Sequence, residues 1–252
     1  MSLPVVVLHG FTGSGAAMAP LTDRLMGDPN SGEAISPDLA GHGLGAQPTE
    51  SNEYTIDAMA AVVAGLVEGP IHLVGYSMGG RVALTLACQY PERVASLSLI
   101  GASAGLAGAH ERAVRAASDD ALADELEADP VAFIDRWMRN PLFVTQERLG
   151  SAAWEASRAQ RLANDPRAMA CSLRMGSTGR MAPLHNVLAA CAMPVGVIVG
   201  SLDEKFRGIA ADLASALPDA EIVAIADSGH ATHVEQPDAT AAAVVATIRR
   251  AL

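Results

Sequence analysis

Two patterns of hydrophobic positions alternate along the chain. In the first, short runs are mostly apolar, which is typical of strands buried in a parallel sheet. The predicted strands are Leu3–Leu8, Glu33–Ser36, Ile71–Val74, Val94–Ile100, Val195–Val199 and Glu221–Ala226. In the second, apolar residues recur every three or four positions, as on one face of a helix. The predicted helices are Ala16–Met26, Thr55–Val67, Met78–Gln89, Phe206–Leu217 and Asp238–Ala251.

One long segment interrupts this alternation. Residues 109–190 have an almost wholly helical spacing and follow the predicted strand Val94–Ile100. Alternating strands and helices predict an α/β fold with a mostly parallel, twisted sheet and helices on both faces. The carboxyl ends of such strands meet at one edge, so the inserted helices should lie above that edge as a lid. We therefore expect a core domain of residues 1–108 and 191–252 and a helical lid of residues 109–190.

Composition narrows the class of protein. Half of the 252 residues are hydrophobic, which excludes a disordered chain, and the net charge is −11. An acidic chain lacks the basic surface that nucleic acids and anionic membranes require. No apolar run is long enough to span a bilayer, and no signal peptide is apparent. The three cysteines form no CxxC pair, so we expect no disulfide framework and no zinc site. These features predict a cytoplasmic protein.

The charges are unevenly distributed. Residues 109–190 carry nearly equal numbers of arginines and acids, whereas the rest of the chain is strongly acidic. A lid that receives an anionic substrate would have this distribution. A helical surface with ion pairs four residues apart would have it as well.

A candidate nucleophile lies between a predicted strand and a predicted helix. Gly75-Tyr76-Ser77-Met78-Gly79 is a G-x-S-x-G sequence. In a strand–turn–helix context, the two glycines permit a strained turn that presents the Ser77 hydroxyl at the top of the sheet. The alternative is that Ser77 only caps the following helix.

A serine nucleophile needs a base, and the base needs a group that orients it. Asp203 and His230 each follow a predicted strand, so both should lie at the same edge as Ser77. The order Ser77, Asp203, His230 is that of an α/β-hydrolase triad. Asp227 and His233 are the alternatives for the acid and the base. In this architecture the backbone N–H groups of Phe11 and Met78 would form an oxyanion hole.

The whole chain resembles the 2-succinyl-6-hydroxy-2,4-cyclohexadiene-1-carboxylate synthase (MenH-type) family of the α/β-hydrolase fold. Several segments carry the resemblance along nearly its full length. They are residues 8–14 (LHGFTGS), 37–43 (PDLAGHG), 75–81 (GYSMGGR), 141–143 (PLF), 203–206 (DEKF) and 229–233 (GHATH). The more specific of these features are Arg81, the run from Asp203 to Phe206, and the second histidine, His233.

The resemblance implies a carbon–oxygen lyase of menaquinone biosynthesis. Such an enzyme eliminates pyruvate from 2-succinyl-5-enolpyruvyl-6-hydroxy-3-cyclohexene-1-carboxylate, using the triad as a base and the oxyanion hole for the developing enolate. It needs no cofactor and no metal. Its partner is a small substrate with several carboxylates, and the chain would be a monomer or a small homo-oligomer. The resemblance also implies a set of substrate-binding residues: Tyr76, Arg81, Arg112, Trp137 and Arg161. Arg158 is an alternative candidate for the role of Arg161.

The resemblance has departures, and two other classes of function remain open. Where the family usually has Gly-Thr-Gly and later a tryptophan, this chain has Ser177-Thr178-Gly179 and His185. These changes affect the predicted pocket and leave the triad intact. The alternative enzyme is a serine hydrolase, either a carboxylesterase or a C–C bond hydrolase, with the same triad. A binding protein built on this fold is the third possibility.

Overall fold

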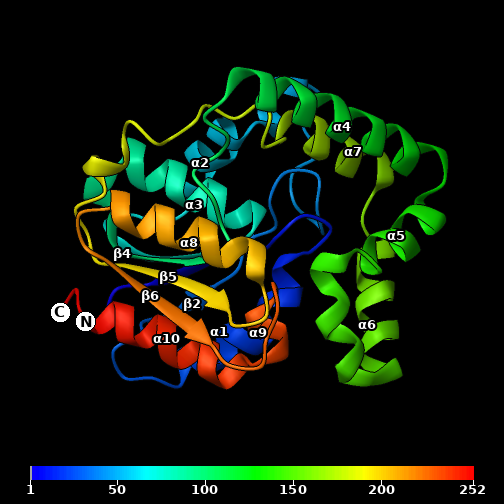
Figure 1. The fold of residues 1–252 in the computed structure, drawn as a ribbon. Helices are drawn as coiled ribbons and strands as arrows, with labels where there is room; N and C mark the ends of the chain where they lie inside the picture. Colours follow the sequence, from blue (N-terminus) through cyan, green and yellow to red (C-terminus); the bar gives the residue numbers. More distant parts are fainter. Residues whose placement is uncertain (1) are drawn as a thin grey trace.

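A sheet of six parallel strands lies at the centre of the molecule (Figure 1). The computed structural model describes residues 2–252. The strand order is β2-β1-β3-β4-β5-β6, and each neighbouring pair is parallel. The strands are β1 (Val5–Leu8), β2 (Ala34–Ile35), β3 (Ile71–Tyr76), β4 (Val94–Ile100), β5 (Val195–Gly200) and β6 (Ala220–Ile225). The predicted parallel α/β sheet is confirmed.

Helices cover both faces of this sheet (Figure 1). On one face lie α2 (Ile56–Ala64), α3 (Met78–Gln89) and α8 (Glu204–Ala216). On the other lie α1 (Ala19–Met26) and α10 (Pro237–Arg249), preceded by the short α9 (Thr232–Glu235). Val6 and Leu8 of β1 pack into the first hydrophobic layer, and Val5 and Val7 pack into the second. Burial on both faces explains why every position of this strand is apolar.

Between β4 and β5 the chain forms a group of helices beside the sheet (Figure 1). They are α4 (Ala109–Ala128), α5 (Pro130–Met138), α6 (Gly150–Leu162) and α7 (Pro166–Met175). Asp129 and Asp165 cap α5 and α7 by accepting backbone N–H bonds, and each precedes a proline. Leu126, Phe133 and Met169 belong to a separate hydrophobic cluster of this lid. The division into a core and a lid with boundaries near 109 and 190 stays a prediction.

The expectation of almost wholly helical structure up to residue 190 is wrong in its last part. Helix α7 ends at Met175, and residues 176–187 form turns and extended chain. Gly176, Gly179 and Pro183 interrupt the helical spacing there. Shorter segments are 3-10 helices: Gly15–Met18, Ser51–Tyr54, Pro91–Arg93, Pro141–Leu149 and Leu188–Ala190. Among residues 2–252, no helix combines the length and apolarity that a membrane crossing requires.

Two of the three cysteines meet in the fold. The Sγ atoms of Cys88, on α3, and Cys191, before β5, lie 3.2 Å apart as free thiols. Their separation in the chain gave no indication of this contact, which depends on how α3 packs beside the end of the lid segment.

Candidate active site

Ser77 occupies a sharp turn between β3 and α3, at the carboxyl edge of the sheet. Its φ and ψ are 52° and −108°, a conformation that non-glycine residues rarely adopt. Its N–H donates to the carbonyl of Ile100 at 2.9 Å, which ties the turn to β4. Within residues 2–252 the Ser77 side chain caps no N–H of α3. The structure therefore gives no support to a capping role for this serine.

The glycines beside Ser77 are required by close packing. A Cβ on Gly75 would lie 2.4 Å from the carbonyl oxygen of Gly79. A Cβ on Gly79 would lie 2.5 Å from the carbonyl oxygens of Leu8 and His9. None of these three backbone oxygens can move without displacing a strand or a helix, so only glycine fits at these two positions.

Asp203 and His230 converge on Ser77. The Nδ1 atom of His230 lies 2.8 Å from Oδ2 of Asp203, and its Nε2 lies 3.2 Å from Oγ of Ser77. Both side chains are almost fully buried. The other carboxylate oxygen of Asp203 accepts the N–H of Phe206 at 3.1 Å and so caps α8. This arrangement can hold the imidazole with its proton on Nδ1 and its Nε2 free to accept the serine proton.

The packing around His230 leaves its ring little freedom. The ring of Phe206 lies 4.4 Å from it, measured between centroids. On another side, a Cβ at Gly101 would come within 2.7 Å of its Cε1 atom, and Gly101 has a φ of +54°. Glycine at position 101 therefore permits the close approach between the histidine and the end of β4.

The alternatives for the base and the acid lie elsewhere. His233 packs on Tyr76, with ring centroids 4.3 Å apart, and burial lowers its pKa to about 3. Its Nδ1 atom has no hydrogen-bond partner among the described residues. Asp227 adopts a φ of 51° in the turn after β6, where its N–H bonds to Ser201. The structure places His230 and Asp203 next to Ser77 in a hydrogen-bonded array, and it does not place His233 or Asp227 in that array.

Two buried histidines fix the loop that contains Phe11. Nε2 of His9 accepts the N–H of Leu39 at 3.0 Å, and Nε2 of His42 accepts the N–H of Thr12 at 3.2 Å. Both imidazoles must therefore be neutral, in agreement with burial, which lowers both pKa values, that of His42 to about 3. The two histidines hold the loop in place and do not reach Ser77.

The candidate oxyanion hole lies beside this loop. Across residues 2–252, the backbone N–H groups of Phe11 and Met78 have no hydrogen-bond partner. Met78 is the first residue of α3, where N–H groups are free and the helix dipole is positive. Two free donors next to a serine suit a developing negative charge on oxygen.

A cavity of about 740 Å³ opens above Ser77 between the sheet and the lid. Several of the expected site residues line it: Phe11, Tyr76, Ser77, Met78, Arg81 and Trp137. The wall also contains His185, the departure expected to affect the pocket, and Lys205 of the run from Asp203 to Phe206. Its remaining charged side chains were not expected from the sequence: Glu111, Arg115, Asp119 and Asp212. Trp137 stands edge-on to Phe11 at 5.2 Å, and its buried indole N–H has no partner in the described chain.

Arg81 reaches the cavity from α3, one turn after Ser77. One Nη atom donates to the carbonyl of Gly176 at 2.6 Å. Burial lowers the pKa of Arg81 to about 10, and the nearby Arg115 adds to this, while Asp119 opposes it. Two guanidinium groups thus lie near one carboxylate. The wall as a whole is balanced, because Lys205 is matched by Glu111 and Asp212, so the excess of positive charge is local to the two arginines. At that point an anionic ligand is favoured.

The other two expected arginines do not line this cavity. Arg112 donates to the carbonyls of Leu106 and Ala107, in the loop before α4. Arg161 is buried near Tyr76, its Nε has no partner within residues 2–252, and burial lowers its pKa. Arg158, the competitor of Arg161, forms an ion pair with Asp135. A substrate-binding role for Arg112 or Arg161 stays a prediction.

Arg115 is the cavity arginine that the sequence analysis missed. It lies one helical turn after the expected Arg112, and its Nε bonds both oxygens of Asp119 at 2.9 Å. No local pattern in the sequence marks it, because only the structure shows that Asp119, Ala123 and Leu126 form one buried face of α4. Arg115 lies four residues before Asp119, so it continues this face of the helix, whereas Arg112 does not.

Comparison with known proteins gives consistent matches. The model of an alpha/beta hydrolase family matches residues 5–243. A Bacillus subtilis (strain 168) protein, provisionally named 2-succinyl-6-hydroxy-2,4-cyclohexadiene-1-carboxylate synthase, is 37% identical over 92% of this chain and 85% of its own length. The structure of MenH from S. aureus has a TM-score of 0.91 and 29% identity, covering 99% of this chain and 94% of that one. A thermophilic esterase from Thermogutta terrifontis, with malate bound, has a TM-score of 0.85 and 25% identity, covering 100% and 91%.

Proposed function

This chain belongs to the alpha/beta hydrolase family and, within it, to the 2-succinyl-6-hydroxy-2,4-cyclohexadiene-1-carboxylate synthases, and from that premise we propose that it eliminates pyruvate in menaquinone biosynthesis. The substrate is 2-succinyl-5-enolpyruvyl-6-hydroxy-3-cyclohexene-1-carboxylate. The observation that carries the proposal is a serine–histidine–aspartate array that opens into a cavity containing two guanidinium groups, those of Arg81 and Arg115.

The chemistry follows from the substrate's structure. Carbon 2 of the ring carries the succinyl ketone, so its C–H bond is acidic. Removal of that proton gives an enolate, whose electron pair forms the new double bond from carbon 2 to carbon 3. The former double bond moves to carbons 4 and 5, and the C–O bond at carbon 5 breaks. The leaving group is the enolate of pyruvate, which takes up a proton.

The triad residues have distinct roles in this reaction. Ser77 accepts the proton from carbon 2 as it gives its own to Nε2 of His230, across the 3.2 Å contact. Asp203 keeps the imidazole in the required tautomer and stabilises its protonated form. The N–H groups of Phe11 and Met78 bind the ketone oxygen as it becomes negative. His230 then returns its proton to the leaving enolate, which closes the cycle.

The cavity residues bind the substrate's carboxylates. Arg81 and Arg115 offer guanidinium groups, and Trp137 contributes an apolar wall and a free indole N–H. A buried donor without a partner is costly until a ligand satisfies it. Tyr76 borders the nucleophile and contributes to the same wall. We place the reaction in the cytoplasm. Since it transfers a proton and breaks a C–O bond, it requires no redox cofactor.

A serine hydrolase is the second candidate, because the same array would also cleave an ester. The esterase likeness at 25% identity favours this alternative. The two functions separate in a comparison of pyruvate release with hydrolysis of a short nitrophenyl ester. Pyruvate release that is lost in Ser77→Ala supports the lyase. Ester cleavage without pyruvate release above the spontaneous rate contradicts it.

A further inference from the structure

The turn that follows α7, residues 176–179, bonds Arg81 directly and is linked to Arg115 through Asp119. The carbonyl of Gly176 accepts a hydrogen bond from Arg81 at 2.6 Å. The next residue, Ser177, donates from its hydroxyl to Oδ2 of Asp119 at 2.7 Å, and Asp119 holds Arg115. We call residues 176–179 the α7 turn. It joins two arginines that come from different helices, α3 and α4.

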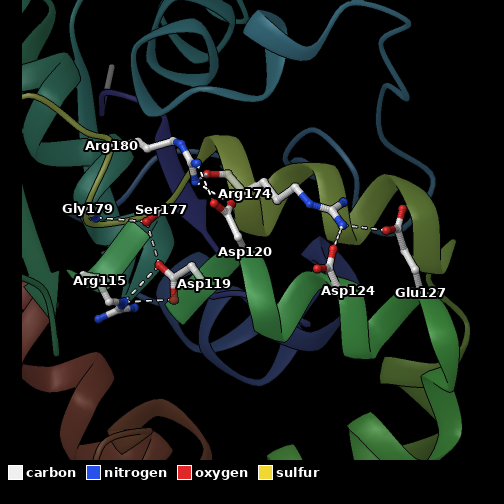
Figure 2. Close-up of polar contacts among 9 residues, drawn as sticks. All are labelled: Arg115, Asp119, Asp120, Asp124, Glu127, Arg174, Ser177, Gly179 and Arg180. Atoms are coloured by element: carbon white, nitrogen blue, oxygen red, sulfur yellow. Dashed lines mark hydrogen bonds and ion pairs between the residues drawn. The ribbon is translucent and has the colours of Figure 1, made fainter. Parts of the chain in front are cut away.

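Asp119 lies between α4 and the α7 turn, and its carboxylate is buried, which is unusual for a charged group. Its side chain is only 2% exposed, whereas that of Arg115 is 43% exposed. The Nε–H group of Arg115 donates a hydrogen bond to both carboxylate oxygens, and the Ser177 hydroxyl donates a second hydrogen bond to Oδ2 (Figure 2). The carboxylate is thus fully paired inside the protein, and its partner arginine faces the cavity.

This pairing orients the rest of the guanidinium group. Nε of Arg115 is occupied by Asp119, while its two Nη atoms have no hydrogen-bond partner within residues 2–252. A carboxylate needs two parallel N–H donors from such a planar group, and these free Nη atoms can supply them. Fixing Nε removes the side-chain freedom that a long arginine would otherwise lose on binding.

The Ser177 hydroxyl is fixed in turn. It accepts the N–H of Gly179 at 3.0 Å while donating to Asp119, so its proton has one direction available. Gly179 packs directly on α4, because a Cβ there would lie 2.4 Å from the carbonyl oxygen of Arg112. The α7 turn is therefore seated against the helix that carries Arg115.

We propose that Asp119 is a positioning residue for the cavity, which holds Arg115 ready for a substrate carboxylate, and that Ser177 locks Asp119 in this position. This inference rests on the proposed function for the identity of the carboxylate ligand. It assigns Asp119 and Ser177 no contact with the substrate; they act through Arg115.

The neighbouring acid provides a matched control. Asp120 follows Asp119 on α4 but pairs with Arg180 at 2.7 and 2.8 Å, on the side of the helix that faces α7 (Figure 2). Asp124 and Glu127 pair with Arg174 along the same side. Asp120→Asn therefore removes an ion pair between α4 and the segment after α7 and leaves the pairing of Arg115 intact.

The kinetic test compares Asp119→Asn, Ser177→Ala and Asp120→Asn in pyruvate release. We expect Asp119→Asn to lower kcat/KM by about 10- to 100-fold, mainly through KM, because a charge-assisted contact is lost. Ser177→Ala should lower it by about two- to tenfold, as a neutral hydrogen bond would. Asp120→Asn should leave KM unchanged. Equal effects of Asp119→Asn and Asp120→Asn would overturn the proposal.

A double-mutant cycle tests whether Asp119 acts through Arg115. In an Arg115→Gln background, Asp119→Asn should have almost no further effect on KM. If it retains its full effect there, Asp119 acts by another route and the proposal is wrong. Melting temperatures of the same variants separate a loss of lid stability from a loss of positioning, because only the latter changes KM at temperatures far below the transition.

An NMR measurement of hydrogen exchange tests the positioning role without depending on the reaction. In ¹⁵N-labelled protein, the Nε–H signal of Arg115 is identified by its disappearance in Arg115→Lys. It should exchange slowly with water in the wild type and in Asp120→Asn, and rapidly in Asp119→Asn. Rapid exchange in the wild type would overturn the positioning role. If wild-type protein releases no pyruvate, the proposed function fails, and this arm still decides the role of Asp119.

Discussion

Replacing Arg81 with methionine should weaken substrate binding without weakening the fold. The guanidinium of Arg81 lies at the cavity wall, and one of its donors is used by Gly176. Burial lowers the pKa of this group to about 10, helped by Arg115 and opposed by Asp119. A charge held under such conditions costs free energy in the absence of an anionic ligand.

The magnitude follows from the pKa. At 1.36 kcal/mol per unit, a fall from 12.5 to about 10 corresponds to about 3 kcal/mol of unfavourable free energy for the charged form. Methionine removes this cost and keeps apolar bulk, but it loses the hydrogen bond to Gly176, which contributes about 1.5–3 kcal/mol. The difference is a stabilisation of about 0–1.5 kcal/mol, so the melting temperature should stay constant or rise by up to about 6 °C.

The activity should change in the opposite direction. Loss of one contact to a carboxylate lowers kcat/KM by about 10- to 150-fold, mainly through KM. Hydrolysis of a neutral nitrophenyl ester, where it is measurable, should be nearly unaffected. Arg93→Met is a suitable control, because Arg93 also bonds backbone carbonyls but does not line the cavity. That variant should lose stability and keep its KM.

Two results would refute this reasoning. A fall in melting temperature in Arg81→Met, together with equal losses on both substrates, would show that Arg81 supports the structure and not the ligand. An unchanged KM for the multi-carboxylate substrate would show that its carboxylates bind elsewhere in the cavity.

Three further predictions follow from the geometry of the site. Asp203→Asn should lower kcat by about 10³–10⁴, because the imidazole loses control of its tautomer; a loss of less than tenfold in steady-state kinetics would contradict the assigned role. Gly101→Ala should lower both kcat and the melting temperature, because the new Cβ would lie 2.7 Å from His230 at a φ of +54°. Gly208→Ala, in open space on α8, serves as its control and should raise the melting temperature slightly. Lowering the pH from about 6.5 to 5 should destabilise the protein, because buried His42 and His233, each with its pKa lowered to about 3, bind a proton only after unfolding. Each of these two histidines should remove up to about 1.4 kcal/mol per pH unit, and thermal unfolding that does not change with pH over this range would argue against this prediction.

The parallel sheet could be predicted because its strands are apolar at every position. Val5 to Leu8 pack alternately into the two hydrophobic layers, and this two-sided burial leaves a clear mark in the sequence. The edge strand is different. Only Ala34–Ile35 pair as β2, within a longer predicted run, because pairing at a sheet edge is set by the neighbouring strand and not by local hydrophobicity.

The positions of Ser77, Asp203 and His230 could also be predicted, because each follows a strand of the same parallel sheet. The lid residues could not be predicted in the same way. Whether Arg112 or Arg115 faces the cavity depends on the rotation of α4 about its axis, which its packing against α7 decides. A single turn of helix separates the two arginines, and no local motif distinguishes them.

The role of the α7 turn was hidden for a related reason. Ser177 looked like a departure within a helical segment, whereas it bonds Asp119 across 58 residues of chain. Long-range contacts of this kind, like that between Cys88 and Cys191, leave no periodic pattern in the sequence.

Pyruvate release by the purified protein and its Ser77→Ala variant is the most direct test of the central claim. Both proteins receive 2-succinyl-5-enolpyruvyl-6-hydroxy-3-cyclohexene-1-carboxylate, and both receive a short nitrophenyl ester in parallel. The account predicts rapid pyruvate release by the wild type, loss of that release in Ser77→Ala, and negligible ester cleavage. Ester cleavage that depends on Ser77, with pyruvate release no faster than the spontaneous rate, would contradict it and identify a serine hydrolase.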